Sequence, residues 1–387
     1  MRAPGIILAL VLTLSACSGS DAGGPEESSY ADGEGISVEV HPRLAHAGED
    51  PAPADAAAYV IDAKLDEAEE GVEVQLQVDG EAGWTVVDEA ETDAKGRASL
   101  TSAESGEQRV VTTDEDNPLG VHFDPAEDSP APTMTDDFVD SIGAWVTRAQ
   151  GYAGVRMCSR ADDRAVRVKD GLLRLSVLDD PQRGLCTHKG ERYAYRLNGH
   201  IGSEAFHIFR FGYAAARIRF QSPRGQHGAF WLQSYGLGTP GPASRTGAEI
   251  DVIEYFGDEH PQGGLTSFVY WTPPGGKSQT QGSWIADPEQ YGEDWSSKFH
   301  VFSVEWTPRE YVFRIDGEIT RRIREGVSGQ PEFLILSLLS SDYELQHIED
   351  DELPVHMDVD WVRVWETPKT LKGERKASRG QGSPGRR

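Results

Sequence analysis

The chain has 387 residues, a length that suggests two or three domains rather than one. Hydrophobic residues make up 38% of it and charged residues 26%, so most of the chain can fold around a buried core. The formal net charge of −27 excludes nucleic acid and anionic lipid headgroups as general partners, and it argues mildly against a strongly anionic polymer as substrate unless a local basic patch intervenes.

The N-terminus is predicted to be an export signal. Arg2 supplies a positive charge, and the apolar run 6–14 is too short to span a bilayer as a helix. The Leu-Ser-Ala-Cys tetrad that ends at Cys17 resembles a bacterial lipoprotein cleavage box. The resemblance implies a signal peptide over 1–16, lipid on the Cys17 thiol and an extracytoplasmic protein anchored to the cell membrane. An ordinary secretory signal, with Cys17 incidental, is the alternative.

Two of the three cysteines, Cys158 and Cys186, remain once Cys17 is assigned to the anchor. An exported protein meets an oxidising compartment, so this pair is a candidate disulfide, with two separate buried thiols as the alternative. The cysteines and the scattered histidines show no zinc-type spacing. No other apolar run is long enough to cross a membrane.

The first third of the mature chain is predicted to contain a small accessory module. Segment 17–35, rich in Gly, Ser, Asp and Glu, is expected to be a flexible tether. Residues 36–123 carry short alternating runs such as 72–78, separated by turn residues, which is typical of an immunoglobulin-like β-sandwich. A spacer and a weak binding module are both open interpretations. The Pro-rich linker 124–134 is expected to be extended.

The largest predicted domain covers residues 135–366. It is rich in alternating segments such as 172–177 and 299–306 and poor in helical periodicity. Many antiparallel strands over this length predict an all-β, concanavalin-like jelly roll of two sheets. The last segment, 367–387, has seven Lys and Arg against one Glu and is predicted to be a disordered basic tail.

The strongest chemical signal is the alternation of three acids with β-branched residues over 249–254. In a strand, Glu249 and Asp251 face the same side because side chains alternate with period two, and Glu254 faces the other side. A single β-bulge near Val252 and Ile253 would return Glu254 to the acidic face. Adjacent like charges repel and raise pKa values, so a purely structural sheet gains nothing from such a row.

Retaining glycoside hydrolysis does use such a row. It requires one ionised and one protonated carboxyl group about 5–5.5 Å apart. The alternatives are a solvated acidic edge strand and a calcium site. Calcium, however, is usually bound by loop oxygens rather than by a β-branched strand.

The flanking segments resemble glycoside hydrolase family 16, the family of laminarinases, lichenases, agarases and carrageenases. Its bulged motif, Glu-x-Asp-x-x-Glu, stands here as Glu249, Asp251 and Glu254. The resemblance covers about residues 135–366. It rests on further segments that follow the family's order: Asp137-Phe138 with Trp145, 170–175, 211–218, 229–232, 299–308, 315–317 and 359–364.

The resemblance implies a retaining endo-β-glycosidase that needs no cofactor for its chemistry. Glu249 would be the nucleophile and Glu254 the general acid/base, while Asp251 would tune both. It also implies a disulfide between Cys158 and Cys186, because the pair brackets Asp170-Gly171 as the disulfide of lichenase-like members does.

Aromatic residues near the motif are predicted sugar-binding platforms. Trp231 matches the family's cleft tryptophan, with a core position as the alternative. Tyr270 and Trp271 lie on what should be the next strand, and Trp284 is a predicted rim residue. The chain departs from the family pattern at His200, where Arg is frequent, and such departures leave the substrate open.

Some family members bind structural calcium away from the cleft. Asp360 matches the side-chain ligand of that pattern, with the backbone of Gly171 nearby, which implies a calcium site here. The alternative is that Asp360 only hydrogen-bonds to backbone groups.

The resemblance implies a polysaccharide substrate, with β-1,3 or mixed-linkage β-glucan expected first. A galactanase of the agarase or carrageenase type is the second expectation. A transglycosylase that remodels surface glycan would share every residue, whereas a non-catalytic glycan-binding protein typically loses the glutamates. Expected partners are the polysaccharide and the membrane, through Cys17, but not nucleic acid. The oligomeric state is not readable from the sequence, although a monomer is expected.

Overall fold

The computed structural model describes residues 30–114 and 118–367. The predicted signal peptide, Cys17, most of the tether and nearly all of the basic tail lie outside the described residues. Within them, strands dominate because short alternating apolar runs are separated by Gly- and Pro-containing turns. None of the helices in these two ranges has the length and apolar character needed to cross a membrane.

The N-terminal module consists of two antiparallel sheets, β1-β2-β5 and β4-β3-β6-β7. Apolar residues from both sheets, such as Ile61 and Val74, form one buried core. The strands of this module are β1 (Ile36–Ala45), β2 (Ala58–Leu65), β3 (Glu73–Val78), β4 (Thr85–Glu91), β5 (Arg97–Ser102), β6 (Gln108–Thr112) and β7 (Gly120–Phe123).

The rest of the chain forms the predicted all-β jelly roll, in which one continuous strand ladder turns over where β12 pairs with β15. The front sheet contains β20 (Gln279–Trp284), β19 (Leu265–Trp271), β18 (Glu249–Tyr255), β17 (His227–Ser234), β24 (Glu332–Leu339) and β15 (Arg196–Gly202), in that order. The back sheet contains β12 (Leu172–Asp179), β25 (Val355–Glu366), β16 (Gly212–Arg219), β21 (His300–Trp306), β22 (Tyr311–Ile315) and β23 (Glu318–Ile323).

The two sheets enclose one hydrophobic core, to which the front sheet contributes Phe230 and Leu336 and the back sheet Val304 and Val362. Short strands extend the ladder: β8 (Met134–Asp136), β9 (Val146–Thr147), β10 (Ser159–Ala161) and β11 (Val166–Lys169). A separate hairpin pairs β13 (Leu185–His188) with β14 (Glu191–Ala194). The helices of the described ranges are all short: α1 (Pro125–Asp128), α2 (Ala243–Thr246) and the 3-10 turns Ala54–Ala56, Asp163–Ala165, Pro288–Gln290, Leu345–His347 and Asp350–Glu352.

The Pro-rich linker differs from its predicted extended form. Asp124 caps α1 by accepting a hydrogen bond from the Ala126 amide, and Pro125 occupies the first helical turn, where its missing N–H costs nothing. Met134 then begins β8, which pairs with β25 of the back sheet. The linker is therefore a docked segment rather than a free spacer.

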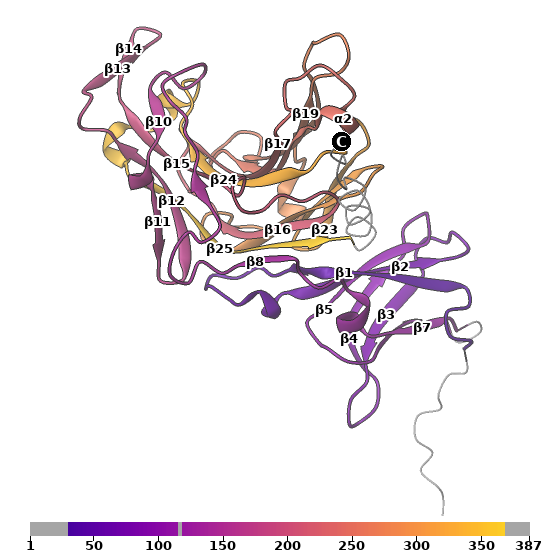
Figure 1. Ribbon diagram of the computed structural model, residues 1–387. Coiled ribbons are helices and arrows are strands. Elements are labelled where there is room, and N and C mark those ends of the chain that lie inside the picture. Colours follow the sequence, from indigo (N-terminus) through magenta and orange to yellow (C-terminus); the bar gives the residue numbers. More distant parts are fainter. Residues whose placement is uncertain (1–29, 115–117, 368–387) are drawn as a thin grey trace, which may run out of the picture.

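The module packs against the outer face of the back sheet, below β25 and β16 in Figure 1. Leu44 and Val60 of the module share a buried cluster with Trp361 and Trp365 of β25. This contact places the module on the side of the jelly roll opposite to β18, and so away from the three acids of the motif.

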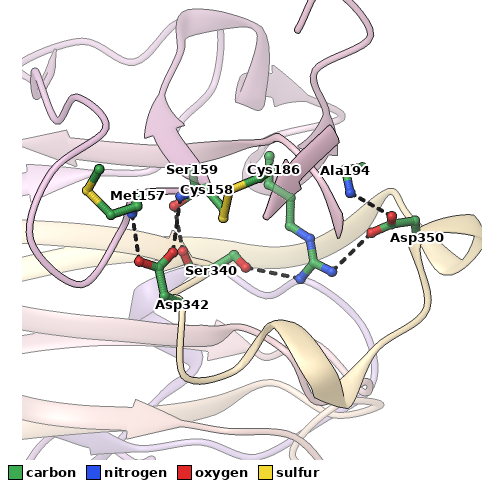
Figure 2. The surroundings of a disulfide bond; sticks show 9 residues. Met157, Cys158, Ser159, Cys186, Ala194, Ser340, Asp342 and Asp350 are labelled. Carbon is green, nitrogen blue, oxygen red and sulfur yellow. Dashed lines mark hydrogen bonds and ion pairs between the residues drawn. A yellow bond between two sulfur atoms is a disulfide. The ribbon is translucent and has the colours of Figure 1, made fainter. Parts of the chain in front are cut away.

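The predicted disulfide is present, with the Cα atoms of Cys158 and Cys186 5.5 Å apart. It ties the loop before β10 to the β13–β14 hairpin. Figure 2 shows that the Asp342 carboxylate lies beside this bond and accepts hydrogen bonds from the amides of Met157, at 2.8 Å, and Cys158, at 3.1 Å. The loop is thus fixed to the segment that follows β24.

Candidate active site

The three acidic residues of the motif, Glu249, Asp251 and Glu254, lie on β18, and the predicted bulge is present. The register against both neighbouring strands shifts between Asp251 and Glu254, and Val252 is the extra residue. Because the bulge restores the alternation, all three carboxylates point away from the core, while Ile250 points into it.

Directly opposed residues of antiparallel strands share a face, so the register identifies the neighbours of each acid. The row through Glu254 contains His200, Ser337, Ala229, Glu254, Thr266 and Trp284. The row through Asp251 contains Ile335, Trp231, Asp251, Phe268 and Gly282. The row through Glu249 contains Phe333, Gln233, Glu249, Tyr270 and Thr280. These three rows are called the carboxylate face below.

The protonation of the three acids is set by burial and by their mutual repulsion. Asp251 is only 5% exposed, and burial followed by the charges of Glu254 and Glu249 raises its pKa well above the usual range. Burial and the charge of Glu254 raise the pKa of Glu249 to about 7. Burial and mutual repulsion therefore favour the neutral forms of these acids, which exchange protons as one coupled set.

Glu254 has partners that moderate its proton affinity. Burial raises its pKa, whereas the charge of His227 and a 3.0 Å hydrogen bond from the Thr266 hydroxyl act in the opposite direction, and the net shift is upward. His227 is itself buried and pairs through Nδ1 with Glu344 at 2.8 Å. Burial lowers the pKa of His227, but the Glu344 carboxylate raises it by more, so the ring favours its charged form.

Two arginines also act on the acids. The positive charges of Arg156 and Arg148 lower the pKa of Glu249, against the larger effects of burial and Glu254. Arg148 lies over Trp231, with its guanidinium carbon 5.6 Å from the ring centroid, and it forms an ion pair with Glu204 at 3.0 Å. The positive charge of Arg148 is thus already balanced, whereas that of Arg156 has no such partner among the described residues.

Three of the four predicted sugar platforms lie on the carboxylate face. Trp231 is half-buried, donates its indole N–H to Ser337 and stacks with His200 at 6.1 Å. Tyr270 lies directly opposite Glu249. Trp284 lies in the Glu254 row, where its ring stacks on His260 at 4.2 Å.

The placement of Trp271 in the sugar-binding group is wrong. It follows Tyr270 directly, so strand alternation turns its side chain to the opposite face of β19. There it packs against the hydrophobic core and over Gly326.

The sequence analysis missed His227, Glu344, Arg148, Arg156 and Tyr343. The period of two did contain a signal for His227, because it lies two and four residues before Ala229 and Trp231 on the same strand. Tyr343 lies in the segment after β24, and desolvation, with smaller effects of Glu344 and Glu254, raises its pKa to about 12.

The predicted calcium ligand Asp360 lies on β25 of the back sheet, remote from the acids. Its carboxylate accepts a 2.5 Å hydrogen bond from the buried Arg217 guanidinium and a 2.9 Å bond from the Ala52 amide. Asp360 and Gly171 line a cavity of about 750 Å³ between module and jelly roll. Because a guanidinium already neutralises the carboxylate, these residues do not fit calcium, and no described group of acids and histidines forms a metal-binding cluster.

Comparisons with known proteins agree with this arrangement. A family model described as glycosyl hydrolases family 16 matches residues 162–363, more than half of the chain. The keratan-sulfate endo-1,4-β-galactosidase of Sphingobacterium multivorum is 24% identical over 200 residues, which cover 48% of this chain and 43% of that enzyme. The chain thus matches less than half the length of this curated relative.

One solved structure similar to this chain is the laminarinase catalytic domain of Thermotoga maritima, with 20% identity and a TM-score of 0.48 over 62% of this chain and 98% of that one. Another comes from work on endo-acting O-glycanases of human gut bacteria, with 19% identity and a TM-score of 0.51 over 64% of this chain and 94% of that one. With the family model spanning most of the jelly roll, the chain belongs to glycosyl hydrolase family 16 and is a glycoside hydrolase.

Proposed function

We propose that this protein is a retaining endo-β-glycosidase that hydrolyses a polysaccharide through a covalent glycosyl-enzyme intermediate. The observation that carries the proposal is the bulge at Val252, which brings Glu249, Asp251 and Glu254 onto one face and couples their charges. Retention needs two carboxyl groups that differ in protonation at the same pH, and a coupled set provides this difference.

In the proposed reaction, Glu249 attacks the anomeric carbon while Glu254 donates its proton to the departing glycosidic oxygen. Arg148 and Arg156 favour the ionised form of Glu249. Once Glu249 is esterified, its negative charge is gone, so the proton affinity of Glu254 falls and Glu254 can activate water. No step requires a cofactor or a metal ion.

The first substrate candidate is a β-1,3 or mixed-linkage β-glucan. Trp231 and Tyr270 on the carboxylate face support a pyranose substrate, because aromatic rings stack on the apolar faces of sugars. The likeness to a keratan-sulfate endo-1,4-β-galactosidase supports a β-galactan as the second candidate.

The test is release of reducing ends from a panel of laminarin, lichenan, agarose, carrageenan and keratan sulfate, the last in sulfated and chemically desulfated forms. Cleavage of at least one member by the wild-type protein, with fragment sizes typical of internal cleavage, is expected. Glu249→Gln is the matched inactive control. Activity on no member of the panel, or full activity of this variant, would contradict the proposal.

A further inference from the structure

Arg156 stands out among the cations of the carboxylate face. Its guanidinium has no hydrogen-bond or ion-pair partner within the described residues, and its Nε is buried without one. Its charge nevertheless reaches a ring of side chains around the acids, whose pKa values it lowers: Glu249, Glu254, His200, His227 and Tyr343.

The loop that carries Arg156 is fixed at several points. A tight turn joins Ala153 to Arg156, whose amide donates to the Ala153 carbonyl at 3.0 Å. The next two amides donate to the Asp342 carboxylate (Figure 2). The amide of Asp342 in turn donates to the carbonyl of Val155 at 2.7 Å. Cys158, two residues after Arg156, is held by the disulfide. The backbone that carries the Arg156 side chain is thereby held in place on both sides of the turn.

The segment that holds the Arg156 loop also contacts the side chains around Glu254, the proposed general acid/base. Glu344, two residues after Asp342, pairs with His227 at 2.8 Å, and His227 acts on Glu254. The segment 340–344 therefore links the Arg156 loop to the Glu254 row. The contacts of this segment and the charge of Arg156 thus both link Arg156 to the acids of the carboxylate face.

The other basic groups nearby do not compete for this role. Arg148 is paired with Glu204. Burial, reinforced by Arg148 and Arg156, lowers the pKa of His200 to about 3, so this ring is neutral at working pH. Both of its ring nitrogens are buried without a partner. Arg156 is thus the cation whose charge remains available to a ligand.

We propose that Arg156 recognises an anionic substituent, a sulfate ester or a carboxylate, on the sugar bound at the carboxylate face. The proposal rests on the proposed function and refines its substrate class. A planar guanidinium binds either oxyanion through two parallel hydrogen bonds. Such a local cation is also what a chain of net charge −27 needs in order to accept an anionic polymer.

The alternative role for Arg156 is internal: it would only favour the ionised forms of the acids. The two roles differ in what they do to neutral substrates. An internal role changes turnover of charged and neutral substrates alike and moves the pH profile. A recognition role changes the affinity for charged ligands and leaves the affinity for neutral ligands unaffected.

The experiment measures binding by calorimetry in a Glu249→Gln background, which removes turnover. The ligands are oligosaccharides of one backbone in three forms: sulfated keratan sulfate, the desulfated product and its carboxymethylated derivative. Arg156→Gln should raise the Kd of the sulfated or the carboxymethylated form by about 10- to 100-fold and leave the desulfated form within about twofold. Arg156→Lys should restore part of the affinity, because it keeps the charge but loses the planar fork.

Arg192→Gln is the matched control, because Arg192 lies exposed on β14 of the disulfide-linked hairpin. This variant should bind all three forms like the parent. The ligand whose binding is weakened by Arg156→Gln, sulfated or carboxymethylated, identifies the anion that Arg156 recognises. Equal weakening of charged and neutral forms, no weakening by Arg156→Gln, or a parent that does not prefer any charged form would each overturn the proposal. Failure of the proposed function is a separate result, since it shows as absence of cleavage across the whole panel.

Discussion

At the scale of single residues, burial rather than residue type decides the charge of the carboxylate face. Asp251 lies between the two glutamates on β18, where burial and two like charges raise its pKa and favour its protonated form. Glu249 and Glu254 retain some exposure and can exchange a proton. Three acids in sequence thus form one coupled set in which burial and mutual repulsion control the charge.

Glu254 is predicted to be the proton donor. Removing it should therefore slow substrates with poor leaving groups far more than aryl glycosides with good ones, because the latter leave without protonation. Steady-state kinetics of Glu254→Ala on both substrate kinds checks this. The wild-type profile of kcat/KM against pH should be bell-shaped, with limbs that belong to the coupled acids. Equal slowing of both substrate kinds would remove Glu254 from this role.

Glu332 is a buried acid that contacts the backbone next to the acidic motif. It is 0% exposed, accepts a hydrogen bond from the amide of Ala248, just before Glu249, and burial raises its pKa to about 8. Between about pH 5 and pH 8 the folded protein holds a proton that the unfolded chain has lost. The free energy of unfolding should therefore fall as pH rises through this window.

Glu332→Gln should remove this pH-dependent decrease in the free energy of unfolding. The free energy of unfolding of the variant should therefore increase relative to that of the wild type by up to about 1.4 kcal/mol for each pH unit in the window. Urea denaturation at pH 5, 6.5 and 8 measures the difference. Parallel stability curves for the two proteins would show that Glu332 is not held neutral by the fold.

At the scale of elements, the local period of a strand was enough to predict most of β18. Strand alternation with one bulge predicted that its three acids lie on the same face of the sheet. The same rule, applied to the pair Tyr270 and Trp271, would have removed Trp271 from the sugar-binding group. Arg156 and Tyr343 lie in loops without a period, and long-range contacts of Cys158 with Cys186 and Asp342 fix the Arg156 loop, so no local pattern could have predicted them.

The disulfide is predicted to stabilise the protein and to position the Arg156 loop. Its two cysteines are 28 residues apart, for which chain entropy gives about 3–4 kcal/mol. The double variant Cys158→Ser, Cys186→Ser should lose stability of this order in denaturant titrations. Peptide mapping without reduction should show the linked pair in the wild type. Two free thiols in exported protein, or an unchanged unfolding midpoint, would contradict this prediction.

At the scale of the whole molecule, the module is joined to the jelly roll by hydrogen bonds between its backbone and a buried ion pair of the back sheet, Arg217 with Asp360. Arg217 is fully buried, and besides Asp360 it donates to the backbone carbonyls of His46 and Asp50 in the module. The module is therefore part of the packed structure of the back sheet. The fold class followed from strand patterns, but this contact joins segments more than 140 residues apart, which local patterns do not encode.

Asp360→Ala should leave the Arg217 charge buried without its partner and cost about 3–5 kcal/mol of stability. Asp360→Asn is the milder control, because it keeps an acceptor for the guanidinium. Thermal unfolding of both variants and of the wild type, each with calcium and with chelator, measures the effect. A wild-type melting temperature that rises with calcium and falls with chelator would restore Asp360 as a metal ligand.

The central claim is that Glu249 is the nucleophile of a retaining enzyme. Glu249→Gln should abolish turnover, while stability holds or rises slightly, because a buried charge is removed. In the smaller Glu249→Ala variant, azide should occupy the space of the missing carboxylate and restore turnover of an activated β-glycoside. Proton NMR of the product gives the anomeric configuration directly. The account predicts an α-glycosyl azide from Glu249→Ala and a β-anomer as the first product of the wild type; an α-anomer as the first wild-type product would contradict it.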